Sequence, residues 1–194
     1  MTGPDLVELA STAGLTEAAL HVRRLPDGPA WARDDGRWRY PASEIKLPLA
    51  VATAAAVAEG RLTWSADVTI DGANMTVNDT PSPMAPGYVS TVEELVTLML
   101  QRSDNVATNQ LFDVLGRKRA TDDVHALGLR ETFFRRKLSG ALPLIEDPEA
   151  TGRNSFPAHE AASLLTALAA GTLPESARLR AILATSWWDV KLSR

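Results

Sequence analysis

Residues 43–59 constrain the fold most, because they predict a helix with almost no polar face. A helix that is apolar all round is normally buried on every side. Pro48 lacks an amide hydrogen and is tolerated only near the start of a helix, so this helix should begin close to Ser43. Gly60 is the expected end. We therefore expect a buried central helix that carries Lys46 in an apolar environment.

Ser43 and Lys46 are three positions apart, which places a hydroxyl and an amine one helical turn apart. A serine hydroxyl becomes a nucleophile when a neighbouring base takes its proton. An apolar environment would lower the pKa of Lys46 and so favour the neutral base. The helix start would also place the Ser43 backbone N–H near the positive end of the dipole, where an oxyanion could form. Taken alone, this pattern more often reflects a helix cap and a solvated lysine.

A second polar motif, Ser103-Asp104-Asn105, interrupts an apolar helical pattern sixty residues after Ser43. Ser103 could pass a proton to a leaving nitrogen, and Asn105 could hydrogen-bond a substrate amide. Asp104 fits a purely structural role most readily. The alternative interpretation is a capped turn between two helices, since all three residue types favour caps. The two motifs together, in this order, indicate a catalytic site.

In this order the motifs resemble those of the penicillin-recognising serine hydrolases, in their class A β-lactamase-like branch. Residues 41–50 resemble the nucleophile box of the family, although Glu44 replaces the usual small or hydroxyl residue. Residues 98–109 resemble its second box, and residues 152–157 resemble the segment after its omega loop. The resemblance covers nearly the whole chain and implies an α+β fold, an αβα sandwich joined to an all-helical lobe.

The resemblance also implies a role for each site residue. Ser43 would be the acylated nucleophile and Lys46 its base, while Ser103 would relay protons and Asn105 would bind substrate. It implies a small-molecule substrate, namely a β-lactam, a peptide or an ester. Neither a metal nor a cofactor is expected, since His159-Glu160 begins like a zinc-binding helix motif but Ser163 replaces its second histidine.

One departure from the family concerns deacylation. The omega loop of class A β-lactamases carries a glutamate that activates the deacylating water, followed four residues later by asparagine. Here Glu146 and Glu149 are followed at that offset by Ala150 and Arg153. Without this glutamate, a β-lactam would acylate Ser43 and leave slowly, as in a penicillin-binding protein.

A second departure concerns the third box of the family, Lys-Thr/Ser-Gly on an inner strand. Residues 137–140 have one residue too many for it, and residues 191–194 do not match. We therefore expect one β-lactamase-like domain over residues 1–194 that lacks the C-terminal strands. Residues 1–45 would form an N-terminal helix and hairpin, and residues 46–186 a mainly helical lobe. The sheet would be incomplete, to be completed by a missing segment or a partner, and Trp187-Trp188 would form an exposed apolar patch.

The remaining segments predict further elements. Residues 4–13 favour a short helix, and residues 20–25 and 30–40 favour a hairpin joined by a turn at 26–28. Ser90 and Glu93 are typical of a capping box for the next helix. The other predicted helices span residues 105–115, 118–127, 158–170 and 176–187.

Composition excludes several function classes. The chain has 194 residues, a net charge of −4 and no cysteine, so it offers no electrostatic argument for binding nucleic acid or an anionic membrane, and no thiolate chemistry. The N-terminus lacks a secretory signal, which predicts a cytoplasmic protein, although a mature periplasmic or secreted product would look the same. Asn78-Asp79-Thr80 has the form of a glycosylation sequon, which matters only after export.

Two hypotheses for function follow. The first is a serine hydrolase that forms an acyl-enzyme on an amide or ester, with β-lactams as the substrate class, acting as a β-lactamase or a penicillin-binding-like protein. A carboxyesterase of the same family is a variant of it. The second is a non-catalytic or truncated β-lactamase-like binding domain, motivated by the two departures.

Overall fold

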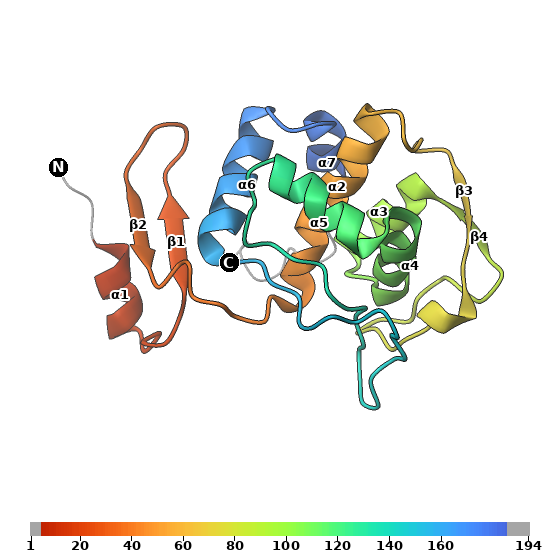
Figure 1. Ribbon diagram of the computed structural model, residues 1–194. Helices are drawn as coiled ribbons and strands as arrows, with labels where there is room; N and C mark the ends of the chain where they lie inside the picture. The colour runs from red at the N-terminus through yellow and green to blue at the C-terminus, as the bar shows by residue number, and fades with distance from the viewer. Residues whose placement is uncertain (1–4, 186–194) are drawn as a thin grey trace.

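The computed structural model describes residues 5–185 and has the apolar helix α2 (Lys46–Ala58) at its centre (Figure 1). Most residues of α2 are buried, as expected, and α3, α4 and α5 pack against it. The prediction that the helix begins near Ser43 was wrong by three residues, because Ala42–Ile45 form a separate 3-10 helix, η1. Pro48 is the third residue of α2, where an amide hydrogen has no partner within the helix. Gly60 follows the helix with a positive φ of 71°.

Five further helices of the described residues, 5–185, form the rest of the helical lobe. They are α3 (Val92–Gln101), α4 (Asn105–Leu115), α5 (Arg117–Ala126), α6 (Ala158–Ala170) and α7 (Ser176–Leu183). The bounds predicted for α4 and α6 are confirmed, whereas α7 ends earlier than residue 187. Trp187 and Trp188, which were predicted to form an apolar patch, lie outside the described residues.

The predicted cap of α3 was wrong by one residue. Thr91 is the N-cap, and its Oγ1 accepts a hydrogen bond from the Glu94 backbone N–H at 3.2 Å. Ser90 instead lies in a strand, and its hydroxyl donates to the Glu94 carboxylate at 2.8 Å. Strand pairing of residues 89–91 moves the start of the helix one residue along the chain.

The N-terminal part lies at one end of the molecule, beside α6 (Figure 1). It contains α1 (Leu6–Thr12) and the antiparallel strands β1 (Leu20–Arg23) and β2 (Ala30–Arg33), with Leu20 opposite Arg33. The expected return strand over residues 30–40 was too long. Asp34 adopts a positive φ of 49°, which ends the extended pairing.

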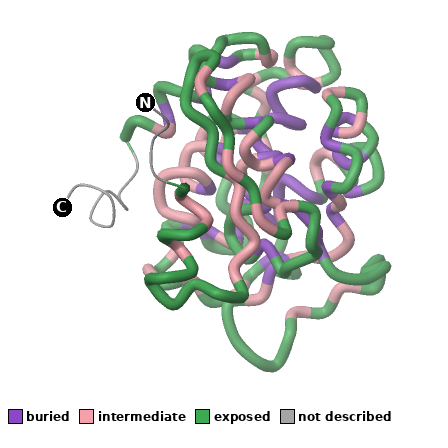
Figure 2. Tube along the Cα trace, turned by 90° about the vertical axis from the view of Figure 1, so that its left-hand side faces the viewer, coloured by how far each residue is buried: buried purple, intermediate pink, exposed green. Residues whose placement is uncertain are grey.

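A second small sheet was not predicted. Strands β3 (Asp67–Thr69) and β4 (Val89–Thr91) pair antiparallel at the opposite end of the molecule, and a short 3-10 helix, η2 (Gly72–Asn74), follows β3. Within residues 5–185 the sheets are therefore two separate two-stranded ribbons. Buried residues concentrate between the helices, as Figure 2 shows. In the same part of the chain no helix has the length and apolar character needed to cross a membrane.

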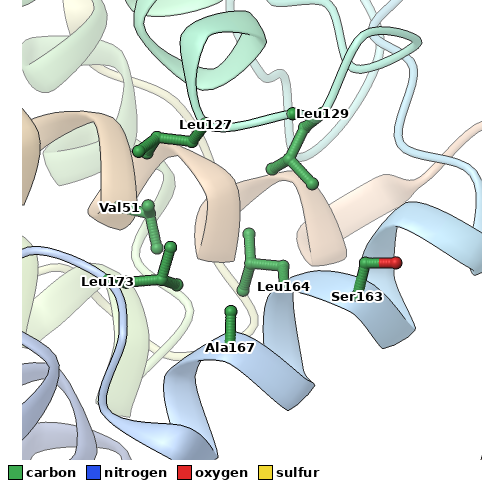
Figure 3. A pocket seen from close by; sticks show the side chains of 8 residues that line it. Val51, Leu127, Leu129, Ser163, Leu164, Ala167 and Leu173 are labelled. Carbon is green, nitrogen blue, oxygen red and sulfur yellow. The ribbon is translucent and has the colours of Figure 1, made fainter.

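An apolar cavity of about 210 Å³ lies between α2 and α6. Figure 3 shows apolar side chains from both helices and from the two adjoining loops around it; they include Val51, Leu127, Leu129, Leu164, Ala167 and Leu173. None of the predicted site residues lines this cavity. Ser43 and Lys46 lie instead at the N-terminal end of α2.

Candidate active site

Lys46 lies in the first turn of α2, and only 3% of its surface is exposed to solvent. Its Nζ is surrounded by oxygen atoms from the two motifs. The distances are 3.2 Å to Ser43 Oγ, 2.8 Å to Ser103 Oγ, 2.5 Å to the Ser103 carbonyl oxygen and 2.8 Å to Asn105 Oδ1. The structure thus brings together all four residues that the sequence singled out.

The two serines lie on different elements that meet over Lys46. Ser43 is on η1, which leads into α2, and Ser103 is on the turn between α3 and α4. Their hydroxyl oxygens are 2.9 Å apart. Ser43, Ser103 and Lys46 therefore form a closed triangle of hydrogen bonds. A proton can move within it from either hydroxyl to the amine.

The backbone is strained beside both hydroxyls. Ala42, which precedes Ser43, has a φ of 46°, and Ser103 itself has a φ of 58°. Non-glycine residues rarely adopt this left-handed conformation, and it occurs preferentially where function requires a fixed geometry. At Ser103 it turns both the hydroxyl and the carbonyl oxygen toward Lys46.

Asp104 has the structural role that the sequence favoured. It is buried, and its Oδ1 accepts a hydrogen bond from the Ala107 backbone N–H at 2.9 Å, which makes it the N-cap of α4. The cap starts the helix at Asn105, directly after the strained serine. Asp104 therefore fixes the turn that presents Ser103 and Asn105 to Lys46.

Asn105 is held by a loop that sequence reasoning did not assign to the site. Its Nδ2 donates to the Val77 carbonyl at 3.0 Å, and its backbone N–H donates to Asn78 Oδ1 at 2.6 Å. These contacts leave Asn105 Oδ1 facing Lys46. The only sequence signal at Asn78 was the sequon-like pattern, which says nothing about a position in the fold.

Burial lowers the pKa of Lys46 from 10.5 to about 8, and the carboxylates of Asp104 and Asp79 act in the opposite direction. At pH 7 about one molecule in ten would then carry the neutral amine. A neutral amine has two N–H donors and one lone pair. The Ser103 carbonyl and Asn105 Oδ1 can accept the two N–H groups, which leaves the lone pair for a serine hydroxyl.

The segment at residues 135–138 is fixed by two buried asparagines. Asn109, on α4, donates to the Leu138 carbonyl at 2.9 Å and accepts from its backbone N–H at 2.8 Å. Asn154 accepts from the backbone N–H groups of Arg135 and Arg136 and donates to the Arg136 carbonyl. Buried amide groups of this kind hold a loop in one conformation.

Neither candidate omega-loop glutamate joins the site. Glu146 and Glu149 are both exposed, and Glu149 forms an ion pair with Arg117. No hydrogen bond links either carboxylate to Ser43 within residues 5–185. Over the same residues no group of three or more His, Cys, Asp or Glu side chains is placed to hold a metal ion.

The sequence model of the beta-lactamase enzyme family matches residues 5–194. The chain belongs to this family. Its membership supports a β-lactamase-like hydrolase. Among curated protein sequences none matches the chain.

Solved structures show that the fold is that of the β-lactamases, which confirms the expected α+β class. The β-lactamase of Sphaerobacter thermophilus DSM 20745 is 26% identical, with a TM-score of 0.73 over 93% of this chain and 67% of that one. A mutant of PBP-A, solved as an acyl-enzyme complex with penicillin-G, is 22% identical, with a TM-score of 0.76 over 96% and 72%. An ancestral class A β-lactamase is 24% identical, with a TM-score of 0.72 over 93% and 70%.

Proposed function

We propose that this member of the beta-lactamase enzyme family is a serine hydrolase that forms an acyl-enzyme at Ser43. Its substrate would be an amide or ester, with β-lactams as the preferred class. The observation that carries the proposal is the triangle of Ser43, Ser103 and the buried Lys46. A nucleophile, a base of lowered pKa and a second hydroxyl in mutual contact are what acyl transfer requires.

Acylation begins with neutral Lys46. Its lone pair takes the proton of the Ser43 hydroxyl, either directly across 3.2 Å or through Ser103 across 2.9 and 2.8 Å. The Ser43 oxygen then attacks the carbonyl carbon of the substrate and forms a tetrahedral intermediate. Lys46 is now an ammonium ion, stabilised by the Ser103 carbonyl and Asn105 Oδ1.

The intermediate collapses when the bond to the leaving nitrogen or oxygen breaks. Ser103 donates its proton to the leaving group and regains one from the Lys46 ammonium. The products are acyl-Ser43 and neutral Lys46, so protons balance over the step. In a β-lactam the leaving nitrogen stays attached through the opened ring, and an ester releases an alcohol.

Deacylation is expected to be slow. A water molecule must attack acyl-Ser43, and a carboxylate beside the ester would activate it. Glu146 and Glu149 are exposed, and within residues 5–185 neither forms a hydrogen bond with the triangle. The protein would then behave more like a penicillin-binding protein than a fast β-lactamase. The acyl-enzyme with penicillin-G described for the PBP-A mutant is a precedent on the same fold.

Intact mass spectrometry tests the proposal. Incubation with a penicillin should add the mass of the whole molecule to one site, and peptide mapping should place it on Ser43. A separate incubation with an activated ester should add its acyl group at the same residue. Ser43→Ala should abolish both adducts, whereas Ser65→Ala, an exposed serine on another loop, should retain them. Adducts of equal yield in Ser43→Ala would refute the assignment.

A further inference from the structure

Asn78 lies outside both sequence motifs, on the loop after η2, yet its side chain contacts the second motif. Its Oδ1 accepts a hydrogen bond from the Asn105 backbone N–H at 2.6 Å. Asn105 is the first residue of α4, and N–H groups in the first turn of a helix have no acceptor within that helix. The N-cap Asp104 satisfies a different N–H group, that of Ala107. Asn78 thus supplies from a distant loop the acceptor that the start of α4 lacks.

The same loop also sets the orientation of the Asn105 carboxamide. The Val77 carbonyl accepts from Asn105 Nδ2 at 3.0 Å. Because the amide nitrogen faces Val77, the amide oxygen faces Lys46 Nζ, at 2.8 Å. Two consecutive loop residues therefore fix the backbone and the side chain of Asn105. Through Asn105 they also fix one of the oxygen atoms around the candidate base.

The loop is held from its other side by Gly140. The Gly140 backbone N–H donates to Thr76 Oγ1 at 3.1 Å. A Cβ atom at residue 140 would collide with the backbone carbonyl of Val77, so only glycine allows this close approach. The Val77–Asn78 loop is thus packed between residue 140 and the start of α4, which limits how far it can move away from Asn105.

The amide nitrogen of Asn78 makes no comparable contact. Asn78 Nδ2 is buried and has no hydrogen-bond partner among the described residues. Turning the amide over would place its N–H groups against the Asn105 N–H, so the oxygen must face Asn105. A buried donor without a partner lowers the stability of the folded protein. Such a group in a native protein calls for an explanation, and the contact of Asn78 Oδ1 with the candidate site supplies one.

We propose that Asn78 is a positioning residue for the acylation of Ser43. The inference rests on the proposed function and adds to it a residue that acts through Asn105. Asn78 holds the start of α4 so that the Asn105 carboxamide stays against Lys46 while protons move between Ser43 and the amine. Without Asn78 Oδ1, the Asn105 backbone N–H loses its acceptor and residues 103–105 are free to shift away from Lys46.

Two substitutions separate the hydrogen bond from the other effects of the side chain. Asn78→Ala removes the acceptor, whereas Asn78→Asp keeps an acceptor oxygen and eliminates the unpaired donor. The rate constant for acylation of Ser43 by a penicillin is measured by intact mass from pH 6 to 10, which gives a plateau rate and a midpoint. Asn78→Ala should lower the plateau about 10-fold, the effect of losing one hydrogen bond. Asn78→Asp should keep it within about threefold of the wild type.

The midpoint of the pH profile reports whether residue 78 acts on Lys46. Asn78→Asp places a carboxylate against Asn105, which itself contacts Lys46, and the added negative charge stabilises the ammonium form. The midpoint of this variant should therefore move toward alkaline pH. Thr80→Ala, two residues along the same loop, should keep the wild-type plateau and midpoint.

Three results would overturn the positioning role. They are a wild-type plateau in Asn78→Ala, a plateau in Asn78→Asp as low as that in Asn78→Ala, and a midpoint that does not move in Asn78→Asp. In the first case Asn78 would contribute to stability alone. In the other two, the acceptor oxygen of residue 78 would not be what holds Asn105 against Lys46.

Failure of the proposed function is recognised separately. If a penicillin and an activated ester both fail to acylate the wild type, the proposed function fails, and hydrogen exchange measured by NMR decides whether Asn78 positions Asn105. An N–H group in the first turn of a helix is protected only by an acceptor outside the helix. The Asn105 amide should be protected in the wild type and in Asn78→Asp, and should exchange about tenfold faster in Asn78→Ala. Equal exchange in all three proteins would overturn the inference.

Discussion

Lys46 Nζ and Ser103 Oγ lie 2.8 Å apart although 57 positions separate the two residues in the chain. Lys46 is fixed by the first turn of a helix whose residues are mostly buried, and Ser103 by the capped turn before α4. Packing of α2 against α3 and α4 therefore sets this distance. The helical core in this way determines where the candidate base meets the candidate relay.

Ser103→Ala should slow acylation of Ser43 by about 100-fold, because a positioned proton donor typically contributes a factor of 10² to 10⁴. The substitution removes the hydroxyl that links Ser43, Lys46 and the leaving group. The measurement is the rate of adduct formation with a penicillin by intact mass. Ser65→Ala, at an exposed serine, is the matched control, and equal rates in Ser103→Ala and wild type would exclude a relay through this hydroxyl.

Lys46→Met should abolish acylation yet increase the free energy of unfolding at pH 7 by about 1 kcal/mol. Holding an ammonium with a pKa near 8 instead of 10.5 costs the folded state about 3 kcal/mol, partly offset by the bonds that Lys46 makes. The folded pKa is lowered, so the penalty is complete below pH 8. It disappears as the pH rises from about 8 to 10.5.

Urea unfolding of wild type and Lys46→Met across pH 7 to 10 measures this difference. The wild type should gain stability relative to the variant over that range, because only its folded state releases a proton there. A variant that is less stable at pH 7, or a difference that does not depend on pH, would contradict a buried amine of lowered pKa.

Asp79→Asn should shift the pH dependence of acylation toward acid. Burial dominates the lowered pKa of Lys46, and the Asp79 carboxylate opposes it, so removing this charge lowers the pKa further. More neutral amine is then present at pH 7 and acylation becomes faster. Asp67→Asn, another exposed carboxylate, is the control. A shift toward alkaline pH would show that Asp79 does not act on Lys46 as a charge.

Asn109→Ala should destabilise the protein by about 2–4 kcal/mol, since it leaves both backbone groups of Leu138 without partners in a buried environment. Hydrogen exchange should also become faster at residues 135–140. Gln101→Ala, which removes an exposed contact to Thr185, should change stability by less than about 0.5 kcal/mol. Similar losses of stability in the two variants would show that Asn109 does not hold the segment at residues 135–138.

Local patterns in the sequence predicted the elements that carry the site. The spacing of Ser43 and Lys46, the apolar run that buries Lys46 and the cap residue Asp104 all act within one or two turns of helix. For that reason α4 and α6 were predicted with their observed bounds. The meeting of Ser43 with Ser103 was expected only through the family resemblance.

Local sequence patterns could not predict the contacts between segments that are distant in the chain. The loop of Val77 and Asn78 is placed against Asn105 by tertiary packing, and no periodicity marks it. The same holds for the cap at Thr91, which depends on pairing of β4 with β3. The left-handed conformation of Ala42 also has no sequence signal, because alanine rarely adopts it.

The most direct test of the account is the pH dependence of Ser43 acylation, measured by intact mass with a penicillin from pH 6 to 10. If neutral Lys46 is the base, the rate should rise about tenfold per pH unit below 8 and level off above it. Lys46→Met should remove this dependence together with nearly all of the rate. A flat profile in the wild type, or full acylation in the variant, would contradict activation of Ser43 by Lys46.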